Sequence, residues 1–230
     1  MASKGNSRHV KSLNAPRYFG TPHKEYKYVV KPNAGRHNLS ESIALLLAIR
    51  KLNPESRNRE IYKLIKSGEV QVNGQKVADP KFPIGISDIV SFKSSDKKFT
   101  LVINKQGKSE LAEGVSEFSQ LYKVIGKYKQ KGNKIMIRLH DGRIIEGQKD
   151  ISVNDSVKLS NGKVEKHIKM GEGARCFVFR GNHVGSKGII RKISPGTKTI
   201  GKSVIIESES ASSSHETFET LMRNIMVYEA

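Results

Sequence analysis

The chain has 230 residues and a strong basic excess, with 41 Lys and Arg against 22 Asp and Glu and a formal net charge of +19. Because such an excess repels itself in a folded protein, it favours a polyanionic partner, and nucleic acid is the partner we expect. The longest apolar run, Ile43 to Ile49, is too short to span a bilayer, and Cys176 alone excludes an internal disulfide or a thiolate zinc site.

The first 37 residues form a basic segment without helical or strand periodicity. They contain eight Lys or Arg, Glu25 as the one acid, and several Pro and Gly. We expect this segment to be disordered in the isolated protein and to order on RNA, with its aromatic side chains available for stacking. The polar start from Met1 to Lys11 lacks the apolar stretch of a cleavable signal, which favours a cytoplasmic protein. The candidate RNA contacts are Lys4, Arg8, Lys11, Arg17, Lys24, Lys27, Lys31 and Arg36.

Two helices are predicted next. Glu41 to Leu52 is apolar nearly all round and has Ser40 at its N-cap position, so it should be a core helix. Ser56 to Lys66 is amphipathic and is followed by Gly68, a helix-stop residue. The apolar stripe of this second helix consists of Ile61, Leu64 and Ile65.

A basic stripe lies on the opposite side of the second helix. Arg59, Lys63 and Lys66 recur at helical spacing, and none of them has a Glu partner at its i+4 position. Such a stripe is more often a solvated face than a binding site. The missing partners favour binding here.

A strand–turn–strand pattern follows this helix. Val70 to Val72, the turn Asn73-Gly74 and Lys76-Val77 predict a hairpin, and Ile89 to Phe92 predicts a further strand. The string from Ser56 to Gly74 resembles the small RNA-binding module named after bacterial small-subunit ribosomal protein four, which also occurs in pseudouridine synthases and a tRNA synthetase. In that family the basic face of the second helix meets the phosphate backbone. The resemblance carries this role over to Arg57, Arg59, Lys63 and Lys66.

From about residue 97 to 170 the pattern changes to short strands separated by turn residues. The expected strands are Phe99 to Ile103, Leu121 to Ile125, Lys134 to His140 and Val157 to Leu159. We therefore expect a second, mostly β domain. Its lysines between residues 123 and 134 could reach RNA, but exposed lysines on a sheet are more often solubilising.

A glycine-rich loop between two apolar segments marks the last part of the chain. Because glycine tolerates positive φ and close approach, such a loop can lie against a sugar–phosphate chain or form a tight barrel corner. A P-loop is excluded, since Gly188 is followed by Ile189. The flanking segments make the loop resemble the KOW motif of ribosomal and transcription proteins, which implies a small barrel. The candidate RNA contacts are Arg180, Gly181, Gly185, Lys187 and Gly188.

An acidic stretch follows the glycine loop. Ser203 to Met222 contains four Glu and no Lys or Arg. In so basic a chain, this local excess of negative charge predicts a surface turned away from RNA. Residues 208–214 are expected to form an exposed loop tip.

Taken in order, the whole chain resembles the archaeal and eukaryotic small-subunit ribosomal protein S4e family. The motifs that carry the resemblance, besides the helical module and the glycine loop, are Arg8-His9-Val10-Lys11, Ala15-Pro16-Arg17, His140-Asp141-Gly142-Arg143, Asn154-Asp155-Ser156-Val157 and Arg223 to Val227. Two departures concern the loop, where Arg180-Gly181 replaces two glycines and the usual basic residue is displaced from Ser186 to Lys187. The chain ends without the long basic tail of eukaryotic members, so the resemblance favours an archaeal protein.

The resemblance implies an α+β multidomain fold and a structural role in the small ribosomal subunit, with 16S-type ribosomal RNA and neighbouring ribosomal proteins as partners. The expected domains are a basic extended N-terminal tail (1–37), the small RNA-binding module with its β-hairpin (38–96), a central mostly β domain (97–170) and an SH3-like KOW-type barrel (171–230). We expect no catalytic residue, cofactor, metal, membrane contact or small-molecule substrate.

Two alternatives stay open. RNA-modifying enzymes also carry the helical module, but the tempting pair His140-Asp141 consists of sequence neighbours, which rarely meet as a catalytic triad requires. A transcription or translation regulator would explain the barrel. It would not explain the basic segment or the excess of positive charge.

Overall fold

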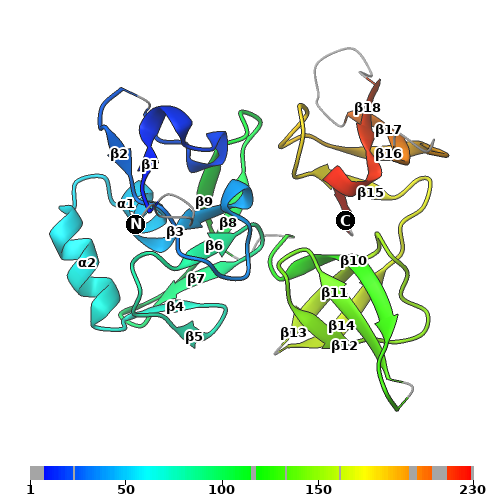
Figure 1. Ribbon diagram of the computed structural model, residues 1–230, viewed down its shortest axis with the longest axis horizontal. Coiled ribbons are helices and arrows are strands. Elements are labelled where there is room, and N and C mark those ends of the chain that lie inside the picture. The colour runs from blue at the N-terminus through cyan, green and yellow to red at the C-terminus, as the bar shows by residue number, and fades with distance from the viewer. Residues whose placement is uncertain are drawn as a thin grey trace, which may run out of the picture. The chain divides into compact units, whose positions relative to one another are not determined.

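The computed structural model describes residues 8–22, 24–114, 118–132, 134–160, 162–196, 201–208 and 217–228. The chain divides into two compact units, one made of residues 1–102 and 107–115 and the other of 103–106 and 116–230 (Figure 1). Both α-helices of the described residues belong to the first unit, and short antiparallel sheets make up most of the rest. The expected α+β class is therefore confirmed.

The first unit contains the two helices, a five-stranded sheet and two small strand pairs. Its helices are α1 (Leu45–Leu52) and α2 (Asn58–Lys66). The sheet has the order β5-β4-β7-β8-β9. Its strands are β4 (Val70–Val72), β5 (Gln75–Lys76), β7 (Ile89–Phe92), β8 (Ser95–Ile103) and β9 (Ser109–Glu113). The pairs are β1 (Val10–Lys11) with β2 (Tyr28–Val29), and β3 (Ser42–Ala44) with β6 (Pro83–Gly85).

The hairpin of β4 and β5 confirms the prediction from Asn73-Gly74. The two turn residues have φ values of 51° and 78°, the positive pair that a type I′ turn requires. The Asn73 side chain also donates to Asp88 Oδ1 (2.6 Å) and accepts from the Ile89 N–H (2.9 Å). The turn is thereby tied to the start of β7.

Helix α1 begins later than predicted. It starts at Leu45 rather than at Glu41, and Ala44 rather than Ser40 precedes it. The reason is a non-local partner: residues 42–44 pair with β6, and the first amides of the helix, those of Leu45 and Leu46, donate to carbonyls of the 80–82 segment at 2.9 and 3.0 Å. These carbonyls replace the side-chain cap that the sequence predicted.

The N-terminal segment is folded onto the first unit. Tyr18 and Phe19, in a 3₁₀ turn, are 6% and 0% exposed, and Ser109 Oγ donates to the Tyr18 carbonyl (2.7 Å). At the other end of the segment, His37 Nε2 lies 2.8 Å from Asp88 Oδ2 inside the protein. The expectation of a disordered tail is therefore wrong for residues 8–22 and 24–37. A sequence without periodicity still buries two aromatic side chains, Tyr18 and Phe19, when distant strands provide the partners.

The boundary expected at residues 96/97 also differs from the structure. The strand predicted at Phe99 to Ile103 is the second half of β8, which pairs with β7. It thus extends the sheet of the first unit instead of opening a central domain.

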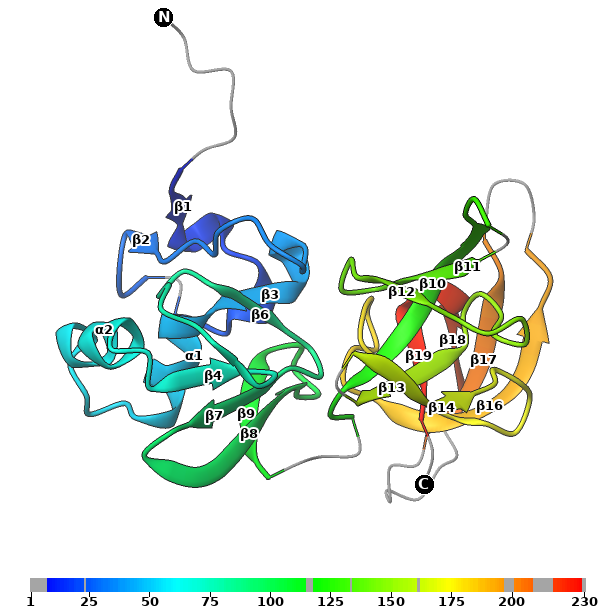
Figure 2. The ribbon, with the colours of Figure 1, turned by 90° about the horizontal axis from the view of Figure 1, so that it is seen from below.

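The second unit consists of two five-stranded antiparallel sheets, which Figure 2 shows from a second direction. The first has the order β12-β11-β10-β13-β14. Its strands are β10 (Leu121–Lys129), β11 (Ile135–Leu139), β12 (Ile144–Glu146), β13 (Ser156–Ser160) and β14 (Lys163–Ile168). The other has the order β18-β17-β16-β15-β19. Its strands are β15 (Arg175–Val178), β16 (Lys187–Ser194), β17 (Ser203–Ser208), β18 (Thr217–Leu221) and β19 (Ile225–Val227).

Each sheet of the second unit encloses its own apolar core, and polar contacts join the two sheets. One core includes Tyr122 and Ile137, and the other includes Cys176 and Ile206. Between them, the buried Lys123 ammonium donates to the Met222 and Ile225 carbonyls at 2.5 and 2.7 Å. In the part of the chain that the structure describes, neither helix has the length and apolar character needed to cross a membrane.

Candidate nucleic-acid interface

Helix α2 has capping contacts at both ends. The Glu60 carboxylate accepts a hydrogen bond from the Arg57 backbone N–H (3.1 Å), which satisfies an amide at the N-terminus. At the C-terminus, Gly68 takes a left-handed φ of 75° and its N–H donates to the Ile65 carbonyl (3.0 Å). Lys63 and Lys66 lie in the last turn, where positive charge complements the helix dipole.

The two faces of α2 divide by chemistry as the spacing predicts. Ile61 and Ile65 are buried at 4% and 0% exposure. The opposite, exposed side carries Arg59, Lys63 and Lys66, and the exposed Arg57 precedes the helix as its N-cap residue; we call these four residues the α2 basic face. Within the described residues, no carboxylate forms an ion pair with this face. The face therefore holds four positive charges without internal counter-ions.

Two further cations lie on or beside the adjoining hairpin. The aliphatic end of Lys76, on β5, lies over Gly68, where a methyl group would come within 1.8 Å of the Lys76 Cε. Arg36 donates to the Gln75 side chain (2.9 Å), which places the last basic residue of the N-terminal segment beside β5. Sequence reasoning missed Lys76 as a candidate, although its place next to the Asn-Gly turn was a usable signal.

The other basic residues of the N-terminal segment are distributed over its surface. Lys27 Nζ lies 5.5 Å from the centre of the Tyr28 ring, a cation–π contact, and Lys31 is half-buried. Lys4 falls outside the described residues. The exposed candidates are Arg8, Lys11, Arg17, Lys24 and Lys27.

The glycines of the loop between β15 and β16 are explained by packing inside the protein. Gly181 and Gly185 have φ values of 92° and 84°, and a methyl group at Gly185 would lie 2.3 Å from the Asn104 carbonyl oxygen. Gly188 is buried in the sheet, where a methyl group would lie 2.2 Å from the Glu207 carbonyl oxygen. These contacts correspond to the tight barrel corner, the alternative given above to a contact with a sugar–phosphate chain.

The charged residues of the same region differ in their surroundings. Lys187 Nζ lies over the Phe118 and Tyr228 rings, 4.8 and 5.9 Å from their centres. Arg180 is exposed, and its pKa is lowered by partial burial and by the positive charge of Arg223. Two arginines of like charge held near each other attract an anion. Sequence reasoning did not select Arg223, because residue 180 and residue 223 meet only in the folded chain.

The fold and these surfaces define a protein that binds a polyanion through a helical module and additional basic surface. Comparison with known proteins gives the family. The model described as the S4 domain matches residues 45–90, the RS4NT (NUC023) domain matches residues 4–40, and the Ribosomal family S4e matches residues 95–165. The S4 match covers α1, α2, the strands β4 to β6 and the first half of β7.

Whole-length relatives agree with these matches. The small ribosomal subunit protein eS4 of Methanococcus aeolicus is 34% identical over 197 residues, which cover 80% of this chain and 81% of that protein. The eS4 protein of Archaeoglobus fulgidus is 33% identical and covers 84% of this chain and 85% of its own length. The crystal structure of the 30S ribosomal protein S4e from Thermoplasma acidophilum aligns with a TM-score of 0.65 at 28% identity, over 81% of this chain and 94% of that one. The chain belongs to the S4e family of ribosomal proteins, in its archaeal form.

Proposed function

We propose that this chain is a structural constituent of the small ribosomal subunit in the cytoplasm, where it binds 16S-type ribosomal RNA, contacts neighbouring ribosomal proteins and supports subunit assembly and translation. It carries out no catalytic step, in keeping with a family of structural ribosomal proteins. The observation that carries the binding mode is the α2 basic face, because four exposed cations without ion-pair partners, on α2 and at its N-cap, attract the phosphate backbone.

Two further surfaces contribute to binding in this proposal. The N-terminal segment supplies Arg8, Lys11, Arg17, Lys24, Lys27, Lys31 and Arg36 to RNA. The sheet of β15 to β19 acts as a KOW-type small barrel, with Arg180 and Lys187 beside its glycine loop. Positive φ at Gly181 and Gly185 supports the motif, and the pairing of Arg180 with Arg223 supports an anion nearby.

Charge reversal on α2 tests the proposal. We expect Arg59→Glu combined with Lys63→Glu to weaken binding to small-subunit ribosomal RNA and to reduce the slope of log affinity against log salt by about 1 for each lost contact. The fold should stay intact, because both side chains are exposed and lie opposite the apolar stripe, so that only the small dipole contribution of Lys63 is lost.

The matched control is Lys81→Glu combined with Lys98→Glu, which changes the net charge of the same unit by the same amount at exposed positions outside α2 and its flanking residues. It should bind RNA more tightly than the α2 variant. Equal affinities for the two double variants would mean that only net charge matters, and wild-type affinity in the α2 variant would make its basic face a solvated surface.

A further inference from the structure

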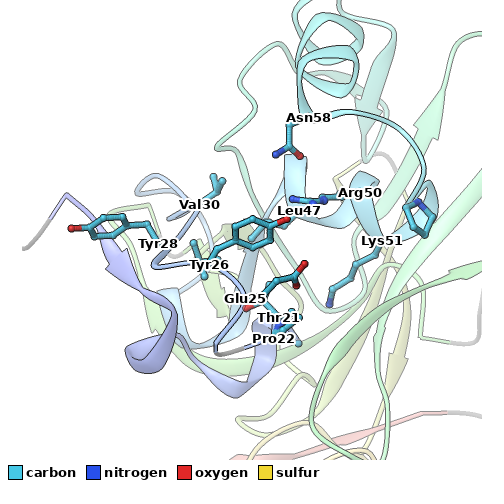
Figure 3. A pocket seen from close by; sticks show the side chains of 13 residues that line it. Thr21, Pro22, Glu25, Tyr26, Tyr28, Val30, Leu47, Arg50, Lys51 and Asn58 are labelled. Atoms are coloured by element: carbon cyan, nitrogen blue, oxygen red, sulfur yellow. The ribbon is translucent and has the colours of Figure 1, made fainter.

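A cavity lies between the N-terminal segment and α1, within the first unit. Its volume is about 430 Å³, within the range of small-ligand sites. Residues 20–22, 25–26 and 28–30 line it from the N-terminal segment, Leu47, Arg50 and Lys51 from α1, Pro54 from the connection between the helices, and Asn58 from the start of α2 (Figure 3).

Two tyrosines of this cavity stay accessible although they belong to a folded segment. Tyr26 and Tyr28 are 54% and 52% exposed, whereas the neighbouring Tyr18 and Phe19 are buried. Figure 3 shows the Tyr26 ring beside the Arg50 side chain, whose guanidinium carbon lies 5.7 Å from the ring centre. An accessible tyrosine ring offers a planar surface on which a nucleobase stacks, and the guanidinium beside it offers a positive charge to a phosphate.

The charged side chains of the cavity differ in what they contact. Lys51 Nζ donates to the Ser109 carbonyl (2.6 Å) and hydroxyl (3.2 Å), and burial lowers its pKa to about 8. Lys51 is therefore held in the wall of the cavity by these hydrogen bonds. Arg50 is the cation better placed to bind a phosphate. Glu25 also lines the cavity, where its carboxylate repels phosphate and accepts hydrogen bonds from a ribose hydroxyl or a base amino group.

The cavity also borders the N-terminus of α2. Asn58 lines the cavity and is the first residue of α2, between Arg57 and Arg59 in the chain. An RNA strand bound at Arg57 and Arg59 therefore contacts residues next in the chain to one that lines the cavity. The cavity volume of about 430 Å³ suits a single nucleotide.

We propose that this cavity takes a single unstacked nucleotide of the bound RNA, with the base against Tyr26, the ribose or base edge toward Glu25 and Asn58, and the phosphate on Arg50. The inference rests on the proposed function, because it assumes that RNA lies on α2. It adds a contact to a base, whereas the α2 basic face contacts only phosphates.

The test uses short oligoribonucleotides in which every position is abasic except one central base, in a version for each base, and a fully abasic oligonucleotide of the same length. For the full-length wild-type chain, we expect the best single base to raise affinity by about tenfold over the abasic probe. Tyr26→Ala should remove this gain, while Tyr26→Phe keeps it because the ring remains. Tyr128→Ala, at an exposed tyrosine of the second unit, should leave the gain unchanged.

The thermal melting temperature of each variant checks that the fold is intact. Arg50→Gln should weaken base-bearing and abasic probes alike, because it removes a phosphate contact. A wild-type chain that binds all probes equally, or a gain that survives in Tyr26→Ala, would overturn the inference. The proposed function has a separate readout in the α2 charge reversal, which compares phosphate binding and needs no base.

Discussion

Lys123 holds a charge between the two sheets of the second unit, and this makes stability depend on pH. Burial lowers its pKa from 10.5 to about 7. The unfolded chain therefore binds the proton more tightly, and the cost of burying the charge is fully present below pH 7. The free energy of unfolding should rise between about pH 7 and pH 10, by up to about 1.4 kcal/mol per pH unit.

Urea denaturation of the wild type and of Lys123→Met at a series of pH values measures this effect. The variant should lose most of the rise. Lys51→Met is the control, because Lys51 has the smaller shift, to a pKa of about 8, and the rise due to Lys123 should remain in that variant. A wild-type profile that is flat over this window would contradict the prediction.

Gly188 illustrates a glycine whose role is internal packing. Since a methyl group there would overlap the carbonyl of a paired strand, Gly188→Ala should destabilise the second unit by about 1–3 kcal/mol. Gly201→Ala is the matched control, because nothing lies within 4 Å of the position its methyl group would take. Chemical denaturation compares the two. Equal stabilities would mean that the strand shifts without cost, and the reason for this glycine would then have to be sought outside the fold.

At the scale of elements, the N-terminal segment connects RNA binding to folding. It carries much of the positive charge, yet Phe19 is fully buried and His37 compensates Asp88. Burial alone would raise the pKa of Asp88, but the charge and hydrogen bond of His37, with hydrogen bonds from Gly85 and Asn73, keep it below its ordinary value. Removing the segment would leave this carboxylate without its main partner.

Deleting residues 1–37 should therefore lower the melting temperature of the first unit. Phe19→Ala alone should cost about 3–5 kcal/mol, the usual loss for a buried Phe. A deletion of residues 1–7 is the control, since it leaves every contact described above in place. If the longer deletion melts at the full-length temperature, the packing of this segment contributes nothing to stability. The RNA contacts of the segment are accordingly better tested by replacing exposed lysines than by truncation.

At the scale of the whole molecule, the sequence predicts what neighbouring residues determine. The α2 stripes and the β4–β5 turn at Asn73-Gly74 need only local spacing and backbone preference, and both are confirmed. The start of α1 depends on carbonyls of residues 80 and 82, and the order of the N-terminal segment depends on Ser109 and Asp88. Neither leaves a local signal. The candidate RNA contacts divide in the same way into local and non-local features. The charges on one helix can be predicted from the sequence, whereas Arg180 and Arg223 meet only in the folded chain.

The hydrogen bond from Ser109 to the Tyr18 carbonyl joins residues that are 91 positions apart. A chain made from its N-terminus at about 5–20 residues per second exposes Tyr18 several seconds before Ser109 exists. During that interval the basic segment has no strand to dock against and is free to meet RNA. In nascent chains that end before residue 109, we expect protease to cleave this segment. In chains that extend past β9, the segment should be protected from protease because it can dock against this strand. The length of the nascent chain therefore determines when the segment becomes ordered.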